Sequence, residues 1–364
     1  MAPTIVLAGA GHAHLLLLYE EMKSPVRAAE YVLISPNRYQ YYSGMYAGYI
    51  EGVYEKDETR VDVAALCSAA GIRFIEAAVT SVDAKQKQVH TSTEAVSYDK
   101  LSLNLGAASG GVPGIKANAR SIKPSYLLPK TAEQLDQAGS IIIAGGGAAG
   151  VETALALKAK DAERKSSRDV TILTSSTLLP EAPAAAQKKI RRELSAKGVL
   201  YREHTPVTNV ASGRVDTPVA VFSADEVLWL AGAGAPAVIA ASGLADKRGF
   251  LPVTKHLQYQ GDPDIFGAGD CVTFLSVPSL AKNGVYAIRQ APILRENLKR
   301  SLAGKNLQPF QPQRQYMAIL SLGGRRAFMF RGRHHARGRL VWQLKDRIDR
   351  KFMDQLHKAA KPGS

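Results

Sequence analysis

The chain has little cysteine, and this scarcity excludes one class of redox chemistry. Only Cys67 and Cys271 occur among 364 residues, far apart and in no Cys-x-x-Cys pattern. Thiol–disulfide chemistry needs two neighbouring thiols, so a redox-active cysteine pair is excluded. Both cysteines are expected to pack in the interior. So few cysteines, together with the lack of a signal-peptide pattern, predict a reducing, cytoplasmic location.

Long uncharged segments are scarce as well. One segment, residues 227–245, is long enough to span a membrane, but it contains Gly232, Gly234, Pro236 and Gly243. We therefore expect a strand followed by a loop there, not a transmembrane helix. A hydrophobic content of 46% and a charged content of 22% are typical of a globular enzyme. The length suffices for two nucleotide-sized domains and a smaller piece.

What the sequence does contain is two glycine-rich turns. Gly9 and Gly11 follow the apolar run 5–8, whereas Gly145, Gly147 and Gly150 follow the apolar run 141–144. An Ala- or Leu-rich segment of helical character comes after each turn. In such strand–turn–helix units the first glycine permits a tight turn and the second lets the backbone approach a pyrophosphate, which the helix N-terminus then binds. The pattern predicts two dinucleotide sites.

A later segment makes this pair of turns specific. Residues 262–266 are typical of a turn and a strand, and they lead to Gly269 and Asp270. Pattern and order resemble the two-dinucleotide-binding-domain flavoproteins, the pyridine nucleotide-disulfide oxidoreductase superfamily. The resemblance covers roughly residues 3–300. It implies FAD at the first turn, NAD(P)H at the second, and Asp270 as the acceptor of hydrogen bonds from the flavin ribitol.

The resemblance implies an α/β fold in three parts. Residues 1–108 and 248–303 are expected to form a Rossmann-like FAD domain, and residues 109–247 an inserted Rossmann-like NAD(P)H domain. Residues 304–364 are expected to form a small basic C-terminal module. The second strands of the two domains are expected at 31–35 and 170–173, and a strand within 98–106 closes the first half.

Shorter strings resemble narrower groups. Residues 145–152 are similar to the type II NADH dehydrogenases, whose equivalent of Glu152 lies where nicotinamide meets flavin. Strings at 11–14, 35–38, 42–45, 284–292 and 342–349 resemble the flavoprotein module fused to selenide, water dikinase in some bacteria. These resemblances imply no metal site and make Glu152 the candidate catalytic residue, with an ordinary helix residue as the alternative. The implied cofactor-binding residues are Gly9, Gly11, His12, Ser35, Pro36, Arg38, Ser43, Gly44, Val79, Gly106, Gly145, Gly147, Gly150, Gly269, Asp270, Gly284 and Val285.

The sequence departs from the dinucleotide pattern in two respects. His14 stands where the third glycine of the first turn is expected, and we expect it to be packed, with His12 facing the phosphates. Neither second strand ends in the carboxylate that usually binds ribose. Ser35 and Arg38 can substitute for it at the FAD site. At the second site Thr174 and Ser175 leave the choice between NADH and NADPH open, and no arginine follows directly to hold a 2′-phosphate.

Two functions remain open. In the first, electrons pass from NAD(P)H through FAD to a quinone or another small acceptor, without a cysteine pair. The helix that begins near Gly284 would then direct its N-terminal dipole at the flavin. In the second, the chain is a FAD-binding accessory or redox-sensing protein with a degenerate NAD(P) site, linked to selenium or sulfur metabolism.

The C-terminal part carries much of the net charge of +15. Residues 325–358 contain eleven Lys and Arg and three Asp, a net +8 by subtraction. Apolar residues recur there every four positions from Leu340 to Leu356, which predicts a basic amphipathic helix. This helix is expected to lie on an anionic membrane at the inner face of the cell membrane, and the alternative is docking on the fold. Nucleic acid is not an expected partner, because no DNA-binding pattern accompanies the charge.

Overall fold

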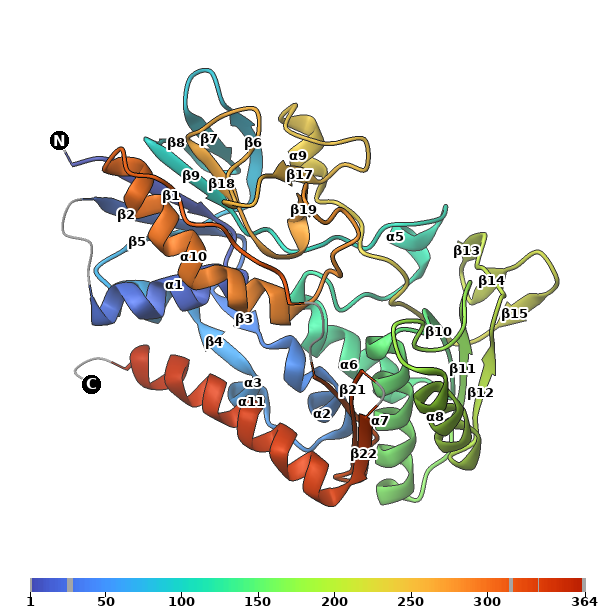
Figure 1. The fold of residues 1–364 in the computed structure, drawn as a ribbon. Helices are drawn as coiled ribbons and strands as arrows, with labels where there is room; N and C mark the ends of the chain where they lie inside the picture. The colour runs from blue at the N-terminus through green and yellow to red at the C-terminus, as the bar shows by residue number, and fades with distance from the viewer. Residues whose placement is uncertain (1, 25–28, 314–316, 333, 362–364) are drawn as a thin grey trace.

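Two parallel sheets, one in each of two lobes, organise the protein (Figure 1). The computed structural model describes residues 2–24, 29–313, 317–332 and 334–361. The first sheet has the order β18-β9-β1-β2-β5 and the second the order β12-β11-β10-β16. The strands of the first are β1 Thr4–Ala8, β2 Glu30–Ser35, β5 Arg73–Glu76, β9 Lys100–Leu103 and β18 Ile265–Gly267. Those of the second are β10 Ser140–Ala144, β11 Asp169–Leu173, β12 Val199–Arg202 and β16 Glu226–Trp229.

These strands form where apolar runs allow burial on both faces. Residues 5–8 and 141–144 are almost completely buried, as expected of central parallel strands. The strands predicted at 31–35, 98–106 and 170–173 are confirmed. The uncharged segment 227–245 begins with β16 and continues as loop and the short helix α9 Ala237–Ala241, so the expectation of a strand without a membrane span is confirmed.

Helices cover the sheets, and small sheets of two or three strands and short turns complete each lobe (Figure 1). On the first sheet α1 His12–Lys23 packs beside α10 Gly284–Leu302, and the Arg295 Nε–Glu21 Oε1 ion pair of 2.6 Å joins them. The other helices of the two lobes are α2 Tyr46–Glu51, α3 Lys56–Thr59, α4 Val63–Ala69, α5 Ile115–Asn118, α6 Leu128–Gln137, α7 Ala148–Arg164 and α8 Ala184–Ala196, with the 3₁₀ turns η1 Ser43–Met45, η2 Ser125–Leu127 and η3 Gly269–Cys271. The other strands are β3 Tyr39–Tyr41, β4 Arg60–Asp62, β6 Val79–Asp83, β7 Gln88–Thr91, β8 Ala95–Ser97, β13 Asn209–Ala211, β14 Arg214–Asp216, β15 Val221–Ser223, β17 Leu251–Val253 and β19 Val272–Phe274.

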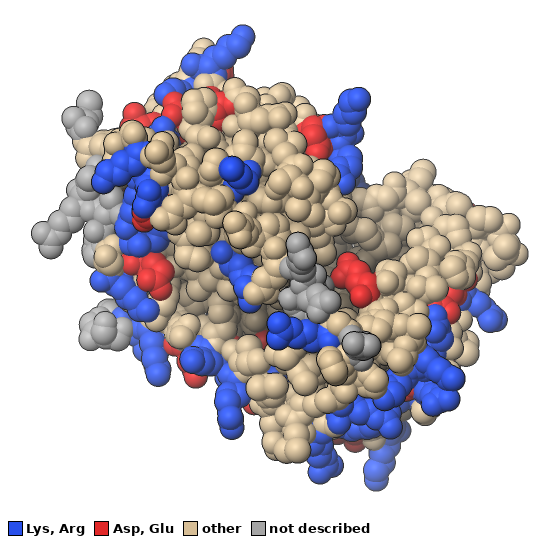
Figure 2. Space-filling model, viewed as in Figure 1, with Lys and Arg blue, Asp and Glu red and all other residues tan. Residues whose placement is uncertain are grey.

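The C-terminal module is a small sheet followed by one long helix. It consists of β20 Ala318–Ser321, β21 Ala327–Arg331, β22 His334–Gly338 and α11 Arg339–Ala359. The amphipathic helix expected from the apolar spacing between Leu340 and Leu356 is confirmed as α11, whereas the first part of the basic stretch 325–358 forms the β21–β22 hairpin; Arg333 lies outside the described residues. Lys and Arg side chains gather along the lower edge of the molecule, where α11 runs (Figure 2). No helix among the described residues is long and apolar enough to cross a membrane.

The apolar stripe of α11 winds around the helix. Leu340 is 80% exposed, Leu344 39% and Ile348 44%, whereas Leu356 is fully buried. A step of four residues advances about 40° beyond one full turn, so a stripe at this spacing drifts from one face to the next. The helix docks on the fold through Val341, Lys345, Asp349 and Met353. The alternative that α11 docks on the fold is thus confirmed for one face of the helix. Beside that face, the apolar side chains of Leu340, Leu344 and Ile348 stay exposed.

Both cysteines lie in the core. Cys67 in α4 and Cys271 in η3 are fully buried, and burial raises the pKa of Cys271 to about 11. The Cys271 thiol lies 3.3 Å from the Ala268 carbonyl oxygen. Both thiols are therefore protonated at neutral pH, and the expectation that they pack in the interior is confirmed.

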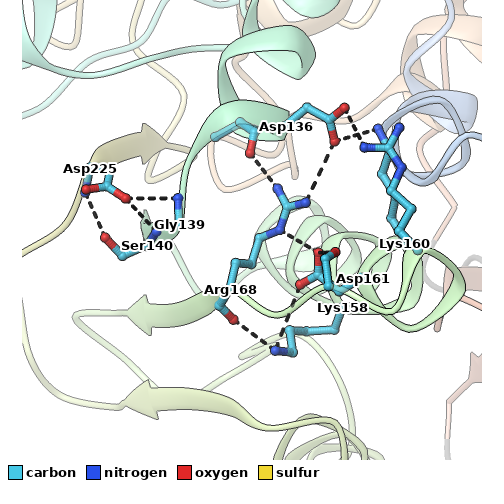
Figure 3. Close-up of polar contacts among 11 residues, drawn as sticks. Asp136, Gly139, Ser140, Lys158, Lys160, Asp161, Arg168 and Asp225 are labelled. Carbon is cyan, nitrogen blue, oxygen red and sulfur yellow. Dashed lines mark hydrogen bonds and ion pairs between the residues drawn. The ribbon is translucent and has the colours of Figure 1, made fainter.

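A buried ion-pair network joins α6 and α7 to the start of β11 (Figure 3). The Arg168 guanidinium lies 2.7 Å from Asp161 Oδ1 and donates to the Leu135 carbonyl oxygen at 2.5 Å. The Arg168 side chain is 5% exposed and that of Asp161 3%. The Arg168 guanidinium is the nearest cation to the buried Asp161 carboxylate, and Lys158 Nζ is 4.0 Å from it, so removing Arg168 leaves this carboxylate poorly compensated.

We expect Arg168→Ala to destabilise the protein by about 3–5 kcal/mol, because it strands the Asp161 carboxylate. Arg164→Ala is the matched control, since Arg164 pairs with Asp136 at 2.8 Å but is 51% exposed. That loss should stay within about 1 kcal/mol. Urea unfolding followed by circular dichroism measures both, and equal losses for the two variants would contradict the assignment.

Candidate functional site

The first glycine turn has the geometry expected from its sequence. Gly9 follows β1 with a φ of +92°, which favours glycine, and its N–H donates to the Ile34 carbonyl oxygen at 2.8 Å. Gly11 precedes the first residue of α1, so the helix N-terminus opens at the carboxyl edge of the first sheet. An anion at this edge meets the positive end of the helix dipole.

Asn104 lies directly behind this turn. Its Oδ1 accepts the backbone N–H groups of Ala13 and His14 at 3.1 and 3.3 Å, and its Nδ2 donates to the Ala268 carbonyl oxygen at 2.7 Å. A Cβ on Gly11 would lie 2.2 Å from Asn104 Oδ1, so packing inside the protein requires this glycine. The sequence predicts a different reason for a glycine here, the close approach of a pyrophosphate, so Gly11 is required on two grounds. Nothing in the sequence marks Asn104 except its position after β9.

His14 is packed, as expected. It is fully buried, with Nδ1 2.6 Å from the Gly9 carbonyl oxygen and Nε2 2.8 Å from Ser102 Oγ. Burial lowers the pKa of His14 to about 4, so its ring is neutral at physiological pH. The imidazole thus fills the space that a glycine would leave in the usual pattern, and its contact with the Gly9 carbonyl oxygen stabilises the turn.

Several predicted residues meet around His12. A Cβ on Gly284 would lie 3.6 Å from Ser43 Oγ and 4.0 Å from His12 Cε1. Burial lowers the pKa of His12, and the nearby Asp270 carboxylate opposes this shift. Among the described residues, His12 Nε2 is buried without a hydrogen-bond partner. A buried, unpartnered nitrogen between two helix N-termini fits a bound polar group, as the predicted FAD would supply.

Asp270 is held at the start of η3. The Gln290 side-chain oxygen accepts the Gly269 N–H at 2.7 Å and fixes the preceding turn. Lys123 Nζ lies 3.5 Å from Asp270 Oδ2. Lys123 comes from the segment between the two lobes, so no sequence pattern pointed to it. The arrangement presents a carboxylate with a cation beside it, close to the His12 cluster.

The end of β2 lacks a carboxylate, but the neighbouring strand brings one. Ser35 is buried and donates to the Asn37 carbonyl oxygen at 3.2 Å. The Arg38 guanidinium forms an ion pair with the Asp62 carboxylate. Its Nε and Nη2 both donate to Asp62 Oδ2, at 3.0 and 2.7 Å, so this guanidinium already has a partner. Glu76 pairs with Ser35 in the sheet, and its Oε1 accepts the Arg38 N–H at 3.0 Å. Glu76 thus supplies an acid at this edge that the pattern of β2 alone did not predict.

The remaining predicted residues of the first site are spread around this edge. Pro36 is exposed after β2, Val79 begins β6, and Gly106 has a φ of +71° with open space beside it. Gly44 lies in η1 with its carbonyl oxygen accepting from Lys345, and Val285 is the second residue of α10. Their part in cofactor binding stays a prediction.

The second glycine turn opens into a cavity of about 550 Å³ at the carboxyl edge of the second sheet. Gly145 has a φ of +129°, and a Cβ on Gly150 would lie 1.9 Å from the Gly145 carbonyl oxygen, so α7 packs closely on β10. A Cβ on Gly147 would instead enter open space. Among the described residues that line the cavity are Thr174, Ser175 and Ser176, and none of the lining residues carries a charge.

Glu152 faces the C-terminal module and is absent from the described lining of this cavity. Its Oε1 accepts the Ser321 N–H of β20 at 2.7 Å. Burial raises the pKa of Glu152 to about 6, against the opposing effects of the Lys345 ammonium and of the Ser321 N–H. The carboxyl group therefore changes its protonation state close to neutral pH.

A buried network of α11 lies beside Glu152. Lys345 Nζ is 2.6 Å from Asp349 Oδ2 and also donates to the Gly44 carbonyl oxygen. Tyr42 hydrogen-bonds to Asp349, and its ring lies against Phe352 at a tilt of 33°, with ring centroids 4.6 Å apart. Burial raises the pKa of Asp349, and Lys345 opposes this shift. The long helix thus reaches into the space between Glu152 and the His12 cluster.

The chain resembles known proteins over most of its length. Residues 3–291 match the family model for the pyridine nucleotide-disulphide oxidoreductases. Ferroptosis suppressor protein 1 of Xenopus tropicalis is 28% identical over 270 residues, 69% of this chain and 69% of that protein. The type II NADH:quinone oxidoreductase of Staphylococcus epidermidis is 25% identical over 341 residues, 84% of each chain.

The fold also agrees with a solved structure. The sulfide:quinone oxidoreductase of Aquifex aeolicus has a TM-score of 0.82 at 18% identity, covering 98% of this chain and 92% of that chain. Proteins of the matched family use FAD and NAD(P)H, in accord with two dinucleotide sites. Because the family match includes both glycine turns and Asp270, the chain belongs to the pyridine nucleotide-disulphide oxidoreductase family.

Proposed function

We propose that the protein is a FAD-dependent oxidoreductase that passes electrons from NAD(P)H through flavin to a quinone. The cavity at the second glycine turn carries this proposal, because Gly147 leaves space there for a nucleotide pyrophosphate. The likeness to a type II NADH:quinone oxidoreductase supports the quinone as acceptor. With both thiols buried and protonated, electrons leave without a cysteine pair.

Several residues of the first site would hold FAD, each at a different part of the cofactor. When bound, FAD accepts a hydride and supplies electrons singly or in pairs. The turn at Gly9 and Gly11 and the start of α1 face the pyrophosphate. His12 Nε2 would bind a phosphate oxygen, and the Asp270 carboxylate would accept hydrogen bonds from the ribitol hydroxyls. The N-terminus of α10 at Gly284 stabilises negative charge on the flavin ring.

Glu152 holds a proton for the acceptor. Reduction of a quinone to a quinol consumes two protons, and a buried carboxyl group with a pKa near 6 is suited to deliver one. Ser321 N–H occupies Oε1, so Oε2 carries the proton. The Lys345 ammonium limits the rise of this pKa, which keeps the carboxyl group able to release and regain a proton near pH 6.

The exposed edge of α11 supports a membrane location. Leu340, Leu344 and Ile348 stand exposed beside Arg347 and Lys351. Apolar side chains flanked by cations suit the headgroup boundary of an anionic bilayer, where each cation contributes on the order of 1 kcal/mol. On this proposal α11 rests on the inner face of the cell membrane, where lipid-soluble quinone is present.

A second function is favoured by one observation. No carboxylate is among the described residues that line the cavity, as in a degenerate nucleotide site. In that case the chain would be a FAD-binding accessory or redox-sensing protein, in keeping with its resemblance to the module fused to selenide, water dikinase. Anaerobic mixing with NADH or NADPH separates the two functions, because only the first predicts bleaching of the flavin band.

We expect Gly147→Val to slow flavin reduction by NAD(P)H by about 100-fold or more, because the side chain fills the approach to the pyrophosphate. FAD content should stay unchanged. Ala185→Val, at an exposed position of α8, is the matched control and should keep the wild-type rate. Stopped-flow absorbance under anaerobic conditions measures both rates, and normal reduction of Gly147→Val would sink the assignment of the second site.

Quinone reduction should depend on the protonation of Glu152. Because only the protonated form donates, the rate of flavin reoxidation by a short-chain quinone should fall as the pH rises through about 6. Glu152→Gln keeps the acceptor for Ser321 N–H, so we expect it to lower this rate by about 100-fold and flatten the pH profile. Glu163→Gln, on the exposed side of α7, should leave both unchanged. An unaltered profile in Glu152→Gln would rule out this role.

Membrane binding should require the apolar edge of α11. The Leu344→Asp/Ile348→Asp variant should lose binding to anionic vesicles by about 10-fold or more, and high salt should weaken binding of the wild type. Gln343→Asp/Gln355→Asp adds the same two charges without removing apolar side chains. Vesicle co-sedimentation compares the three proteins, and equal losses in both variants would show that charge alone decides.

A further inference from the structure

A lysine from the segment between the two lobes reaches a carboxylate of the first lobe. Lys123 Nζ lies 3.5 Å from Asp270 Oδ2, and among the described residues no other cation lies within 4.0 Å of this carboxylate. The nearby Lys282 has other partners, because its ammonium donates to the Val272 carbonyl oxygen at 2.6 Å and lies 3.7 Å from the centroid of the Phe250 ring. Lys123 is therefore the cation next to Asp270.

The second lobe holds the backbone that leads to Lys123. The Arg120 N–H donates to the Val227 carbonyl oxygen of β16 at 2.7 Å. The Arg120 guanidinium forms a bidentate ion pair with Glu226 of the same strand, at 2.8 and 2.9 Å. Ser121 Oγ then accepts the Lys123 N–H at 2.9 Å, which fixes the next turn of the chain. Lys123 is thus anchored to the second sheet, whereas its ammonium lies beside a residue of the first lobe.

Stability alone gives little reason for this ion pair. The Lys123 side chain is 41% exposed and that of Asp270 18%, and an ion pair so open to water contributes little to folding. Asp270, however, is the residue expected to accept hydrogen bonds from the ribitol of FAD. A cation beside a cofactor contact, held there by the other lobe, points to an action on the bound cofactor.

Reduction adds negative charge to the flavin, so the charges around it shift its reduction potential. A cation lowers the free energy of an anionic reduced flavin more than that of the neutral oxidised form. The N-terminus of α10 at Gly284 supplies about half a positive charge for this purpose, and the ammonium of Lys123 supplies a full one. Without Lys123, the Asp270 carboxylate would leave an uncompensated negative charge at the same place, with the opposite effect.

We infer that Lys123 raises the reduction potential of the FAD, so that a residue held by the second lobe sets the electron affinity of the cofactor in the first. This inference rests on the proposed function, because it needs FAD beside Asp270. Lys123 acts through its charge alone and transfers neither a hydride nor a proton. By stabilising the reduced flavin it makes the uptake of a hydride from NAD(P)H more favourable.

The test is the midpoint potential of the FAD-loaded full chain, measured by anaerobic titration against a reference dye. Lys123→Met removes the ammonium and should weaken the preference for reduced over oxidised FAD by about tenfold, which lowers the midpoint by about 30 mV for a two-electron couple. Lys123→Arg keeps the charge and should keep most of the wild-type potential. Lys130→Met, at an exposed position of α6, removes the same charge and is the matched control, with an unchanged potential.

The same quantity can be measured when a variant loses its cofactor during purification. Titration of the apoprotein with oxidised FAD and with dithionite-reduced FAD gives two dissociation constants, and their ratio should change by about tenfold in Lys123→Met. The melting temperature of this variant should hardly change, because the ion pair is half open to water. A lower melting temperature together with an unchanged ratio would show a purely structural lysine and overturn the inference.

The outcomes separate this inference from the proposed function. An unchanged potential in Lys123→Met, with flavin that NAD(P)H still reduces, overturns the inference and leaves the proposed function standing. A lowered potential in Lys123→Met, when NAD(P)H does not reduce the wild-type flavin, supports the inference and overturns the proposed function. A wild-type chain that binds neither form of FAD overturns both.

Discussion

The side-chain amide of Asn104 joins the first glycine turn to the segment that returns from the second lobe. It accepts the backbone N–H groups of Ala13 and His14 and donates to the Ala268 carbonyl oxygen. Gly11 and Gly269 must then lack side chains, because a Cβ at either would lie within 2.5 Å of this amide. The position of Asp270 relative to α1 follows from the same contacts. A site composed of residues more than 250 positions apart thus depends on one buried, fully bonded amide.

The C-terminal module is part of the site as well as a surface. Lys345 and Asp349 of α11 form a buried ion pair, and such a pair is retained at a desolvation cost. The ammonium group donates to the Gly44 carbonyl oxygen of the first lobe and opposes the rise that burial causes in the pKa of Glu152 in the second. The helix therefore connects the two lobes electrostatically. Its outer edge, with Leu340, Leu344 and Ile348, is free for contact with a surface.

Local patterns predicted the framework and the last helix, but not the hairpin that precedes this helix. The strands at 4–8, 31–35 and 170–173 were predictable because apolar runs beside glycine turns have few alternatives. The helix α11 was predictable from the apolar spacing between Leu340 and Leu356, but nothing in the basic stretch before it indicated the β21–β22 hairpin. The spacing of four residues did not predict which apolar side chains of α11 are buried: Leu340 is exposed to solvent, whereas Leu356 lies in the core.

The sequence by itself determined where the two turns lie and which residues must be glycine, because a positive φ at Gly9 or Gly145 is a requirement of the local backbone. It also determined that no thiol pair takes part. Only the tertiary structure decided that Asn104 supports the first turn and that Glu76 supplies the acid missing from β2. Glu152 likewise obtained its raised pKa from burial against β20. These properties arise from contacts between separate strands and helices, and such contacts depend on sheet register and packing, which no local pattern of residues encodes.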